Sequence, residues 1–551
     1  MPRQSKRILA LAVLSPLAAI QAASAAQSAE ERSLSELRNT VINLLETLVE
    51  RGVVTREQAQ AMVASAQAKA ASEAAAAAAA AEAQEKADAG AVRVPYVPEI
   101  VKEEIRKQVV AEVTPQITQG VIEEAKADRL GVLGAMPDWV QRMKWSGDVR
   151  VRGQGDLFAS DNLPQTYQDV NAINSKGGIQ KAGALGAFLN TTEDRARLRA
   201  RLRLGFNAEL GWGWSLGGRL ATGNLTDPVS TNQTLGTYGA RYQTGLDLAY
   251  LGWLGRSSTG RHALSVSAGR IANPWLSTDL VWDPDLTFDG VAASYRLGLA
   301  RDDPDSHYVF LTAGAFPLQE IELSKNDKWL YGAQLGVHWK FSGGSGLRLG
   351  LAYYDYENIT GRRNTLDSNL LDYTAPPFVQ KGNTLFDIRV DSDVDPNTSN
   401  LLALAAAYRL ADVTIAYDWK LSPSYRLSIT GDAVRNIGFD EAQVAARVGG
   451  PVPKRDTGYQ AEISFGTSAL GMHGGWRAFF GYKYLESDAV LDAFTDSDFH
   501  LGGTNAQGYF IGADYALTPR VITRLRYLSA NEIDGLPFGV DVLQLDLTAQ
   551  F

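Results

Sequence analysis

Five arginines occupy alternate positions of one short segment, with alanine or leucine between them. A guanidinium group donates paired hydrogen bonds to carboxylates and phosphates, and a row of such groups attracts anions from a distance. The spacing therefore favours the steering of charged or dipolar solutes. The five residues are Arg195, Arg197, Arg199, Arg201 and Arg203.

Residues for metal, redox or proton-transfer chemistry follow no comparable pattern. The chain has no cysteine, which excludes disulfides, thiolate metal sites and a cysteine nucleophile. Its five histidines are scattered, without the spacing of a motif such as H-E-x-x-H. We therefore expect no metal, no cofactor and no catalytic residue. The histidines are His262, His307, His338, His473 and His500.

The arginine segment itself predicts a β-strand. Between Asp194 and Leu210 apolar residues alternate with polar ones, a period of two that a helix cannot produce. If this strand crosses a membrane, each arginine on the lipid face costs about 2–4 kcal/mol, so all five must face the inside of a barrel. The same alternation recurs at 329–341, 347–353 and 476–484, and each segment is long enough to cross a bilayer at a tilt.

The composition fits an all-β transmembrane barrel better than a helical membrane protein. The 551 residues include 52 Gly, 21 Tyr and 11 Trp, yet the mean hydropathy is −0.15. In such a barrel half of the side chains of each strand face water. The 53 basic residues are outnumbered by 62 acidic ones, so nucleic acid is not an expected partner.

The N-terminus has the features of a secretory signal peptide. Three basic residues precede an apolar run at 8–20, and the small-x-small sequence ASA follows at 23–25. The run of about 13 residues is shorter than the roughly 18 that a spanning helix needs, which disfavours an uncleaved anchor. We expect residues 1–25 to be a cleaved signal peptide.

Residues 26–135 predict a helical, coiled-coil-like region in the periplasm. Apolar residues recur at steps of three and four between residues 34 and 48, the spacing of an associating helix. The alanine run at 74–81 favours a second helix, and apolar residues at steps of four after residue 99 favour a third. A bundle packed on itself, a trimerisation stalk and an anchor to peptidoglycan all agree with this pattern, and no residue decides between them.

Connections between the expected strands of the barrel region, 136–551, alternate in length, as loops and turns of bacterial barrels do. Residues 401–421 could form a hairpin, which gives seventeen strands, or one long strand with a bulge near Leu410, which gives sixteen. Because bacterial barrels have even strand numbers, we predict about sixteen antiparallel strands around a water-filled lumen. The long connections are 157–193, 224–243, 271–287, 318–328, 357–400, 435–456, 487–507 and 532–538; the short ones are 211–213, 255–261, 299–306, 342–346, 422–424, 467–474 and 518–519.

The last strand of a closed barrel pairs with the first, which gathers arginines from three strands into one basic arc on the lumen wall. Arg150 and Arg152 lie on the first predicted strand, and Arg520, Arg524 and Arg526 on the penultimate one. The arginines of the second strand complete the arc. They could make the pore selective for anions, or loop carboxylates could neutralise them, and both could hold at once.

Several stretches carry a family resemblance: 44–59 (LLETLVERGVVTREQA), 92–99 (VRVPYVPE), 136–140 (MPDWV), 144–150 (KWSGDVR), 417–421 (YDWKL) and the terminal Phe551. They resemble the putative porin family of outer-membrane proteins. The resemblance implies periplasmic helices joined to a general diffusion barrel, in a homotrimer, in the outer membrane of a Gram-negative bacterium. It assigns no substrate, so no binding residue follows from it.

In general porins the third external loop folds inward and narrows the channel, and by analogy we expect the same of the third external connection, 271–287. Trp275, Asp279, Asp283 and Asp285 would then form a constriction loop that faces the arginine arc. An ordinary extracellular loop would place the same residues in solvent.

The resemblance also predicts a role in assembly for the C-terminal strand. In similar proteins the barrel assembly machinery reads an aromatic C-terminal strand, so Leu543, Leu545, Leu547 and Phe551 would be an assembly signal. The alternative is that Phe551 is only one of the aromatic residues at the membrane surface.

Together these patterns predict an outer-membrane porin, surrounded by lipid, through which small hydrophilic solutes or ions diffuse passively, with anions favoured. The alternative is a structural tether that links the outer membrane to the cell wall through the N-terminal helices. A barrel enzyme such as a protease or lipase is not expected, because the sequence has no compact set of catalytic groups.

Overall fold

The structure, a computed structural model, describes residues 142–183, 186–322, 324–390 and 400–551. They belong to one compact unit, Asp128–Phe551. The predicted signal peptide (1–25) and helical region (26–135) lie outside the described residues, as does the start of the predicted barrel region. No helix in the described part of the chain is both long and apolar enough to cross a membrane.

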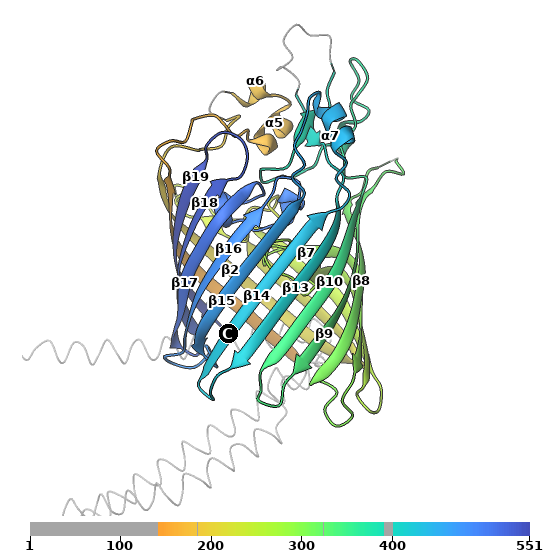
Figure 1. The fold of residues 1–551 in the computed structure, drawn as a ribbon, viewed down its shortest axis with the longest axis vertical. Coiled ribbons are helices and arrows are strands. Elements are labelled where there is room, and N and C mark those ends of the chain that lie inside the picture. Colours follow the sequence, from red (N-terminus) through yellow and green to blue (C-terminus); the bar gives the residue numbers. More distant parts are fainter. Residues whose placement is uncertain (1–141, 184–185, 323, 391–399) are drawn as a thin grey trace, which may run out of the picture. The chain divides into compact units, whose positions relative to one another are not determined.

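Within the described residues, sixteen antiparallel strands close into a barrel, which confirms the predicted fold (Figure 1). The sheet has seventeen strands, but β4 (Gln233–Thr234) only adds two residues against β2 and is not part of the wall. β19 pairs with β1 and closes the ring. The wall strands are β1 (Met143–Phe158), β2 (Arg195–Gly211), β3 (Trp214–Thr222), β5 (Thr244–Arg256), β6 (His262–Ala272), β7 (Thr287–Gly298), β8 (His307–Gln319), β9 (Lys328–Lys340), β10 (Gly346–Glu357), β13 (Arg409–Lys420), β14 (Tyr425–Asn436), β15 (Thr457–Thr467), β16 (Trp476–Leu485), β17 (Ala506–Thr518), β18 (Val521–Glu532) and β19 (Gly539–Gln550).

Longer and shorter connections alternate as predicted, except that the connection 320–327 is as short as the turn 299–306 before it, so the barrel has a long-loop end and a short-turn end. One of the two shortest turns joins β2 to β3 through Trp212 and Gly213, both with positive φ (56° and 83°), as a type I′ hairpin turn requires. We number the long loops L1 (159–194), L2 (223–243), L3 (273–286), L4 (320–327), L5 (358–408), L6 (437–456), L7 (486–505) and L8 (533–538).

Among the described residues, short helices lie in four of the long loops, and Figure 1 shows the helices α5, α6 and α7 at the same end of the barrel. Asp169 caps α5 by accepting a hydrogen bond from the backbone N–H of Ala172 (2.9 Å). The helices are α5 (Val170–Lys176) and α6 (Ile179–Ala182) in L1, α7 (Glu441–Val448) in L6, and the 3-10 helices η1 (Asp372–Thr374) in L5 and η2 (Asp492–Phe494) and η3 (Phe499–Leu501) in L7.

The prediction of one long strand over residues 401–421 is wrong, although the strand count is right. β13 begins only at Arg409, and β12 (Leu402–Leu404) pairs with β11 (Leu385–Asp387) in a two-stranded sheet within L5. Residues 403–406 are almost inaccessible to solvent. Residues buried beneath loops and residues exposed to lipid are both apolar. The sequence pattern therefore does not distinguish a buried loop segment from a membrane-spanning strand.

Outward-facing side chains form an apolar band with aromatic residues near both of its edges, the pattern of a barrel that crosses a bilayer. Leu545, for example, is 57% exposed. Exposed aromatic residues near the short-turn end are Trp214, Trp339, Trp419, Tyr425 and Tyr515, and those near the long-loop end are Tyr331, Tyr353, Tyr459 and Tyr509.

Part of the barrel interior is packed with apolar side chains, whereas the sequence predicts a water-filled lumen. Parts of L3, L5 and L7 lie against the inner faces of β6–β10, β13, β14 and β16 in the long-loop half. Trp282 of L3 and Tyr408 of L5 are fully buried there, beside Tyr354 of β10. We call this the apolar cluster. It leaves the opposite side of the interior to polar groups.

Candidate functional site

The polar side of the interior is an arginine wall formed by β18, β1 and β2, with β19 between β18 and β1. Nine of the ten arginines predicted for the basic arc lie at its inward-facing positions, while neighbours such as Leu198 and Leu202 face outward and are exposed. Arg520 differs from the prediction: β18 begins at Val521, so Arg520 lies in the preceding turn. The wall residues are Arg150, Arg152, Arg195, Arg197, Arg199, Arg201, Arg203, Arg524 and Arg526.

The most buried arginine of the wall has two carboxylate partners. Arg152 pairs with Asp546 of β19 (Nε–Oδ1 2.7 Å) and with Asp498 of L7 (Nη1–Oδ2 2.9 Å). Asp498 also accepts a hydrogen bond from Arg526 (2.7 Å). Burial disfavours the charged form of Asp498, but Arg152 and Arg526 outweigh it and hold the pKa of this carboxyl well below its ordinary range.

Three arginines of β2 have partners on the neighbouring strand β1. Arg197 pairs with Asp156 at 2.6 Å, and Arg201 and Arg203 both pair with Asp148 at 2.7 Å. We did not predict either carboxylate from the sequence. Both have the same parity along β1 as its inward-facing arginines, so the alternation held the signal that identifies them.

Beyond β19, which pairs with β1 and closes the ring, Asp514 of β17 forms ion pairs with two arginines. It accepts hydrogen bonds from Arg524 (2.5 Å) and from Arg477 of β16 (2.7 Å). Arg219 of β3 pairs likewise with Asp247 of β5 at 2.5 Å. Ion pairs between neighbouring strands thus neutralise much of the positive charge on the inner face.

L3 is anchored on the wall opposite the arginines. The side chain of Gln334 on β9 bonds both backbone groups of Leu276, at 2.8 and 2.7 Å. Thr278 donates through its N–H (3.1 Å) and its hydroxyl (2.6 Å) to Asp432 of β14. These bonds fix the first half of L3 inside the barrel.

The other end of L3 reaches the arginine wall. Asp285 lies 3.4 Å from Arg201 and 3.3 Å from Arg203, and the hydroxyl of Thr231 in L2 donates to it at 2.8 Å. Burial alone would raise the pKa of Asp285, but Arg201 and Arg203 hold it below its ordinary value. L3 therefore crosses the interior from one wall to the other.

The other two acidic residues of L3 do not contact the arginine wall. Asp279 pairs with Lys483 of β16 at 3.2 Å. Asp283 accepts a hydrogen bond from the backbone N–H of Ser497 in L7 (2.9 Å), and burial together with the nearby Asp496 raises its pKa well above the ordinary value. Of the three predicted carboxylates, only Asp285 lies against the arginines.

Trp275 also lies away from the arginines, in contrast to the sequence expectation for an inward-folded loop. Its ring packs edge-on against Tyr354 (5.2 Å between centroids) and Phe316 (6.1 Å) in the apolar cluster. The residue therefore anchors L3 on the far wall.

Three arginines of the wall have no carboxylate within 4.0 Å among the described residues: Arg150, Arg195 and Arg199. Arg150 donates to the side-chain oxygen of Asn232 in L2 (2.5 Å). Arg199 donates to Gln154 and to the hydroxyl of Ser230, both at 3.3 Å. Within the described part of the chain, the Nε atoms of Arg150 and Arg199 are buried without a hydrogen-bond partner.

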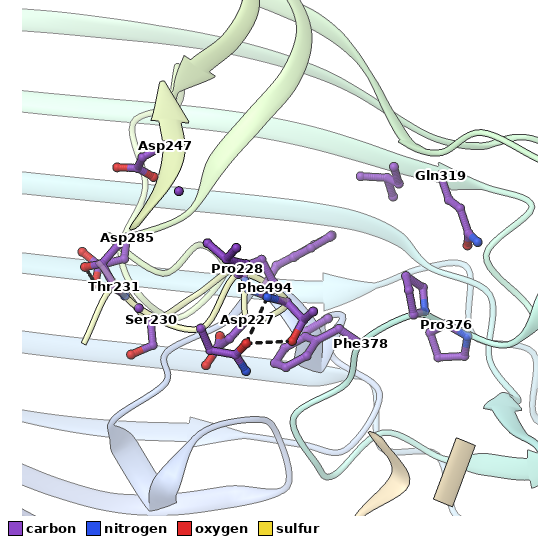
Figure 2. Close-up of a pocket in the computed structure, with 18 of the residues that line it drawn as sticks. Asp227, Pro228, Ser230, Thr231, Asp247, Asp285, Gln319, Pro376, Phe378 and Phe494 are labelled. Carbon is purple, nitrogen blue, oxygen red and sulfur yellow. Dashed lines mark hydrogen bonds between the residues drawn. The ribbon is translucent and has the colours of Figure 1, made fainter. Parts of the chain in front are cut away.

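Two cavities are lined by arginines of the wall, and another cavity lies next to one of them. One of about 420 Å³ (Figure 2) lies between L2 and L5, with Thr231 and Asp285 on one side of the view and Gln319 and Pro376 on the other. A second, of about 310 Å³, shares three lining residues with it and extends to the arginines of β2. A third, of about 430 Å³, lies at the short-turn end beside Arg203.

The predicted C-terminal signal residues lie on the outer face of the closing strand. Leu543, Leu545 and Leu547 are exposed to the surroundings of the barrel. Phe551 exchanges two backbone hydrogen bonds with Gly147 of β1, at 3.2 and 3.1 Å. A Cβ atom on Gly147 would lie 2.7 Å from the Phe551 ring, so glycine makes room for it.

Solved structures that resemble the chain are outer-membrane proteins. OmpF of Salmonella typhi in complex with daunomycin has 11% identity and a TM-score of 0.39, over 74% of this chain and 97% of that one. OprB of Pseudomonas putida at high pH has 12% identity and a TM-score of 0.41, over 75% and 95%. DcaP of Acinetobacter baumannii has 12% identity and a TM-score of 0.37, over 74% and 97%.

No curated protein matches the chain. The model of one protein family, described as "Putative porin", matches residues 38–551. This match includes the whole barrel and most of the sequence before it, and the chain therefore belongs to the putative porin family.

Proposed function

We propose that this outer-membrane channel lets small hydrophilic solutes and ions diffuse passively and that it favours anions. The observation that carries the proposal is the placement of L3, which fills one side of the interior and leaves cavities along the arginine wall on the other. In the membrane the long-loop end would face outward and the short-turn end the periplasm, as in bacterial barrels.

The narrowest part of the path is assigned to the contact between Asp285 of L3 and Arg201 and Arg203 of β2. Cavities lie on either side of this contact: Asp285 lines the one of about 420 Å³, and Arg203 lines the one of about 430 Å³ at the short-turn end. Opposite charges on facing walls create a transverse field that orders dipolar solutes.

Anion preference follows from the arginines without carboxylate partners. Arg150 and Arg199 present guanidinium donors that have no carboxylate within 4.0 Å among the described residues. In a low-dielectric barrel interior such charges attract anions more strongly than they would in water. Much of the remaining arginine charge is paired, so a moderate preference is expected.

Planar-bilayer recordings of the full protein test this function. We expect conductance in KCl and, under a salt gradient, a reversal potential on the anion-selective side. Arg150→Gln combined with Arg199→Gln should move the reversal potential toward cations. Arg409→Gln removes one arginine charge outside the pore, on an exposed residue of β13, and should leave the reversal potential unchanged. Well-folded protein without conductance would contradict the proposal.

The remaining proposals concern assembly and the N-terminal region. The barrel would form a homotrimer in lipid and would be inserted by the barrel assembly machinery through its C-terminal strand. The predicted helices at 26–135 would lie in the periplasm, as a trimerisation stalk or as a tether to peptidoglycan. Deleting residues 27–128 tests the tether: if attachment of the outer membrane to the cell wall stays unchanged, the tether is rejected and the channel is unaffected.

A further inference from the structure

The cavity of about 310 Å³ beside the arginine wall has a lining with two chemically different sides. Residues from β1 and β2 meet parts of L1, L2, L5, L7 and L8 around it. Its volume is at the lower end of the range in which proteins bind small molecules. We call it the amphipathic cavity.

One side of the amphipathic cavity is cationic. Arg195, Arg197 and Arg199 follow one another at every second position of β2. Lys381 of L5 lies beside them, and burial lowers the pKa of its amino group to about 7, so the arginines carry most of the positive charge. Arg197 is paired with Asp156, but Arg195 and Arg199 have no carboxylate partner among the described residues.

The donors of Arg199 are poorly satisfied by the protein. Its two hydrogen bonds, to Gln154 and Ser230, are both 3.3 Å long, and its buried Nε has no partner in the described part of the chain. Charge-assisted hydrogen bonds of guanidinium groups are ordinarily shorter than 3 Å. A carboxylate placed in the cavity would offer Arg199 the acceptor that the protein does not.

The acidic lining residues do not cancel this charge. Asp156 is already bound to Arg197. Burial raises the pKa of Asp227, the other acidic residue of the lining. Lys381 has no carboxylate within ion-pairing distance among the described residues; it donates to the carbonyl of Gly502 at 2.7 Å and lies 2.9 Å from a ring nitrogen of His500.

The other side of the cavity is apolar. The rings of Phe158 and Phe538 stack at 6.2 Å with an angle of 18° between their planes, and Phe378 and Leu501 complete this side. A small inorganic anion gains nothing from such a surface. A ligand with an apolar body gains free energy when it removes this apolar surface from water.

The cavity has an opening to solvent and a continuation inward. Asn190 and Arg195 line it and are exposed, which places its mouth at the long-loop end. Asp227, Ser230 and Phe378 also line the cavity of about 420 Å³, so the two are neighbours.

We propose that the amphipathic cavity binds small organic acids that combine one carboxylate with an aromatic or branched apolar body. Arg199 and Arg195 hold the carboxylate, and Phe158 and Phe378 contact the body. The site rests on the proposed function, because it gives the channel a binding step for one class of anion near its mouth.

Titration calorimetry of the purified full-length protein with benzoate tests the site. Benzamide keeps the shape without the charge, acetate keeps the charge without the ring, and phosphate is an anion without an apolar body. We expect benzoate to bind at least about tenfold more tightly than each of them, because benzamide lacks the charged acceptor for Arg199, and acetate and phosphate lack the apolar body. Equal binding of phosphate and benzoate would overturn the proposal in favour of a general anion site.

Three variants locate the site. Arg199→Gln should weaken benzoate binding about tenfold, and Arg199→Lys should restore part of it, because a lysine keeps the charge but not the guanidinium fork. Phe378→Ala should weaken benzoate and leave acetate unchanged. Arg409→Gln is the matched control on the outer rim and should change nothing.

Bilayer recordings of the same preparation separate this site from the proposed function. A conducting protein that does not bind benzoate overturns the site and leaves the channel intact. A protein that binds benzoate but does not conduct keeps the site and overturns the channel.

Discussion

Arg152 and Asp546 face each other directly across the seam between β1 and β19, and two parallel hydrogen bonds of 2.7 and 2.9 Å join them. Both side chains are almost fully buried inside the barrel. Asp498 of L7 bonds the same guanidinium from the lumen side. One arginine therefore connects the first strand, the last strand and an infolded loop.

Arg152→Ala should lower the free energy of unfolding by about 3–5 kcal/mol, because it leaves buried carboxylates without their counter-charge. Urea unfolding in lipid vesicles, followed by tryptophan fluorescence, measures the change. Arg195→Ala is the control: Arg195 is exposed and has no ion pair among the described residues, so its loss should change stability by less than about 0.5 kcal/mol. Equal stabilities of the two variants would mean that the seam pair contributes nothing.

Asp285→Asn should make the channel more selective for anions. The change removes the negative charge that lies 3.4 Å from Arg201 and 3.3 Å from Arg203, and both arginines then face the lumen with less compensation. Reversal potentials under a KCl gradient record the shift. Asp289→Asn removes the same charge from an exposed pair with Arg270 and should leave selectivity as it is. A shift toward cations in Asp285→Asn would contradict the assigned constriction.

Asp492→Asn should remove a pH-dependent loss of stability. Asp492 of L7 is fully buried, and burial, followed by the nearby Asp488, raises its pKa from the ordinary value of 3.8 to about 7. Between these values the folded state keeps a proton that the unfolded state releases, so wild-type stability falls as pH rises from about 4 to 7. At about 1.4 kcal/mol for each pKa unit, the full loss is roughly 4 kcal/mol.

The measurement compares unfolding of wild type and Asp492→Asn at pH 4.5 and pH 8. We expect the variant to gain stability relative to wild type at pH 8 and to differ little at pH 4.5. Asp534→Asn, on an exposed residue of L8, should give no such pH-dependent difference. A constant difference between Asp492→Asn and wild type at both pH values would argue against a buried, protonated Asp492.

Ile429→Arg and Thr430→Arg test the assignment of the two faces of β14. Ile429 is 47% exposed on the outer face, where an arginine costs about 2–4 kcal/mol near the middle of the bilayer. Thr430 faces the lumen directly beside Glu462 of β15, so an arginine there gains a partner. We expect only the Ile429 variant to lose stability in vesicles, and the reverse order would exchange the two faces.

Phe551→Ala should reduce the amount of protein in the outer membrane severalfold, because the proposed assembly signal loses its aromatic end. Quantifying heat-modifiable protein in membrane fractions gives the readout. Trp419→Ala, an aromatic residue near the same end of the barrel, serves as the control. If both variants assemble equally well, Phe551 is only one of the aromatic residues at the membrane surface.

Strand positions were predictable because each wall strand alternates between a lipid-facing and a lumen-facing residue along its whole length. Lipid on one side and polar groups on the other impose a period of two, as in β2, where Leu198 and Leu202 alternate with arginines. The same period fixed which way nine predicted arginines point.

The loop interior was not predictable in the same way. Asp498 neutralises Arg152 from 346 residues away, and nothing periodic in L7 signals that contact. Trp275 was expected to face the arginines, yet Tyr354 and Phe316 offer its ring apolar contacts on the far wall. Such placements depend on which loops meet inside the barrel, which is a property of the tertiary structure and not of a local pattern.

The seam has a consequence for how the protein folds. Arg152 and Asp546 are 394 residues apart, whereas every other pair of neighbouring wall strands is joined by a single loop or turn. The entropic cost of closing a loop grows with its length, so the pairing of β1 with β19 has the largest loss of chain entropy of all strand pairings in the barrel. An unclosed barrel would leave two open sheet edges, which recruit other chains. The ion pair stabilises only the closed ring and thereby acts against misassembly through those edges.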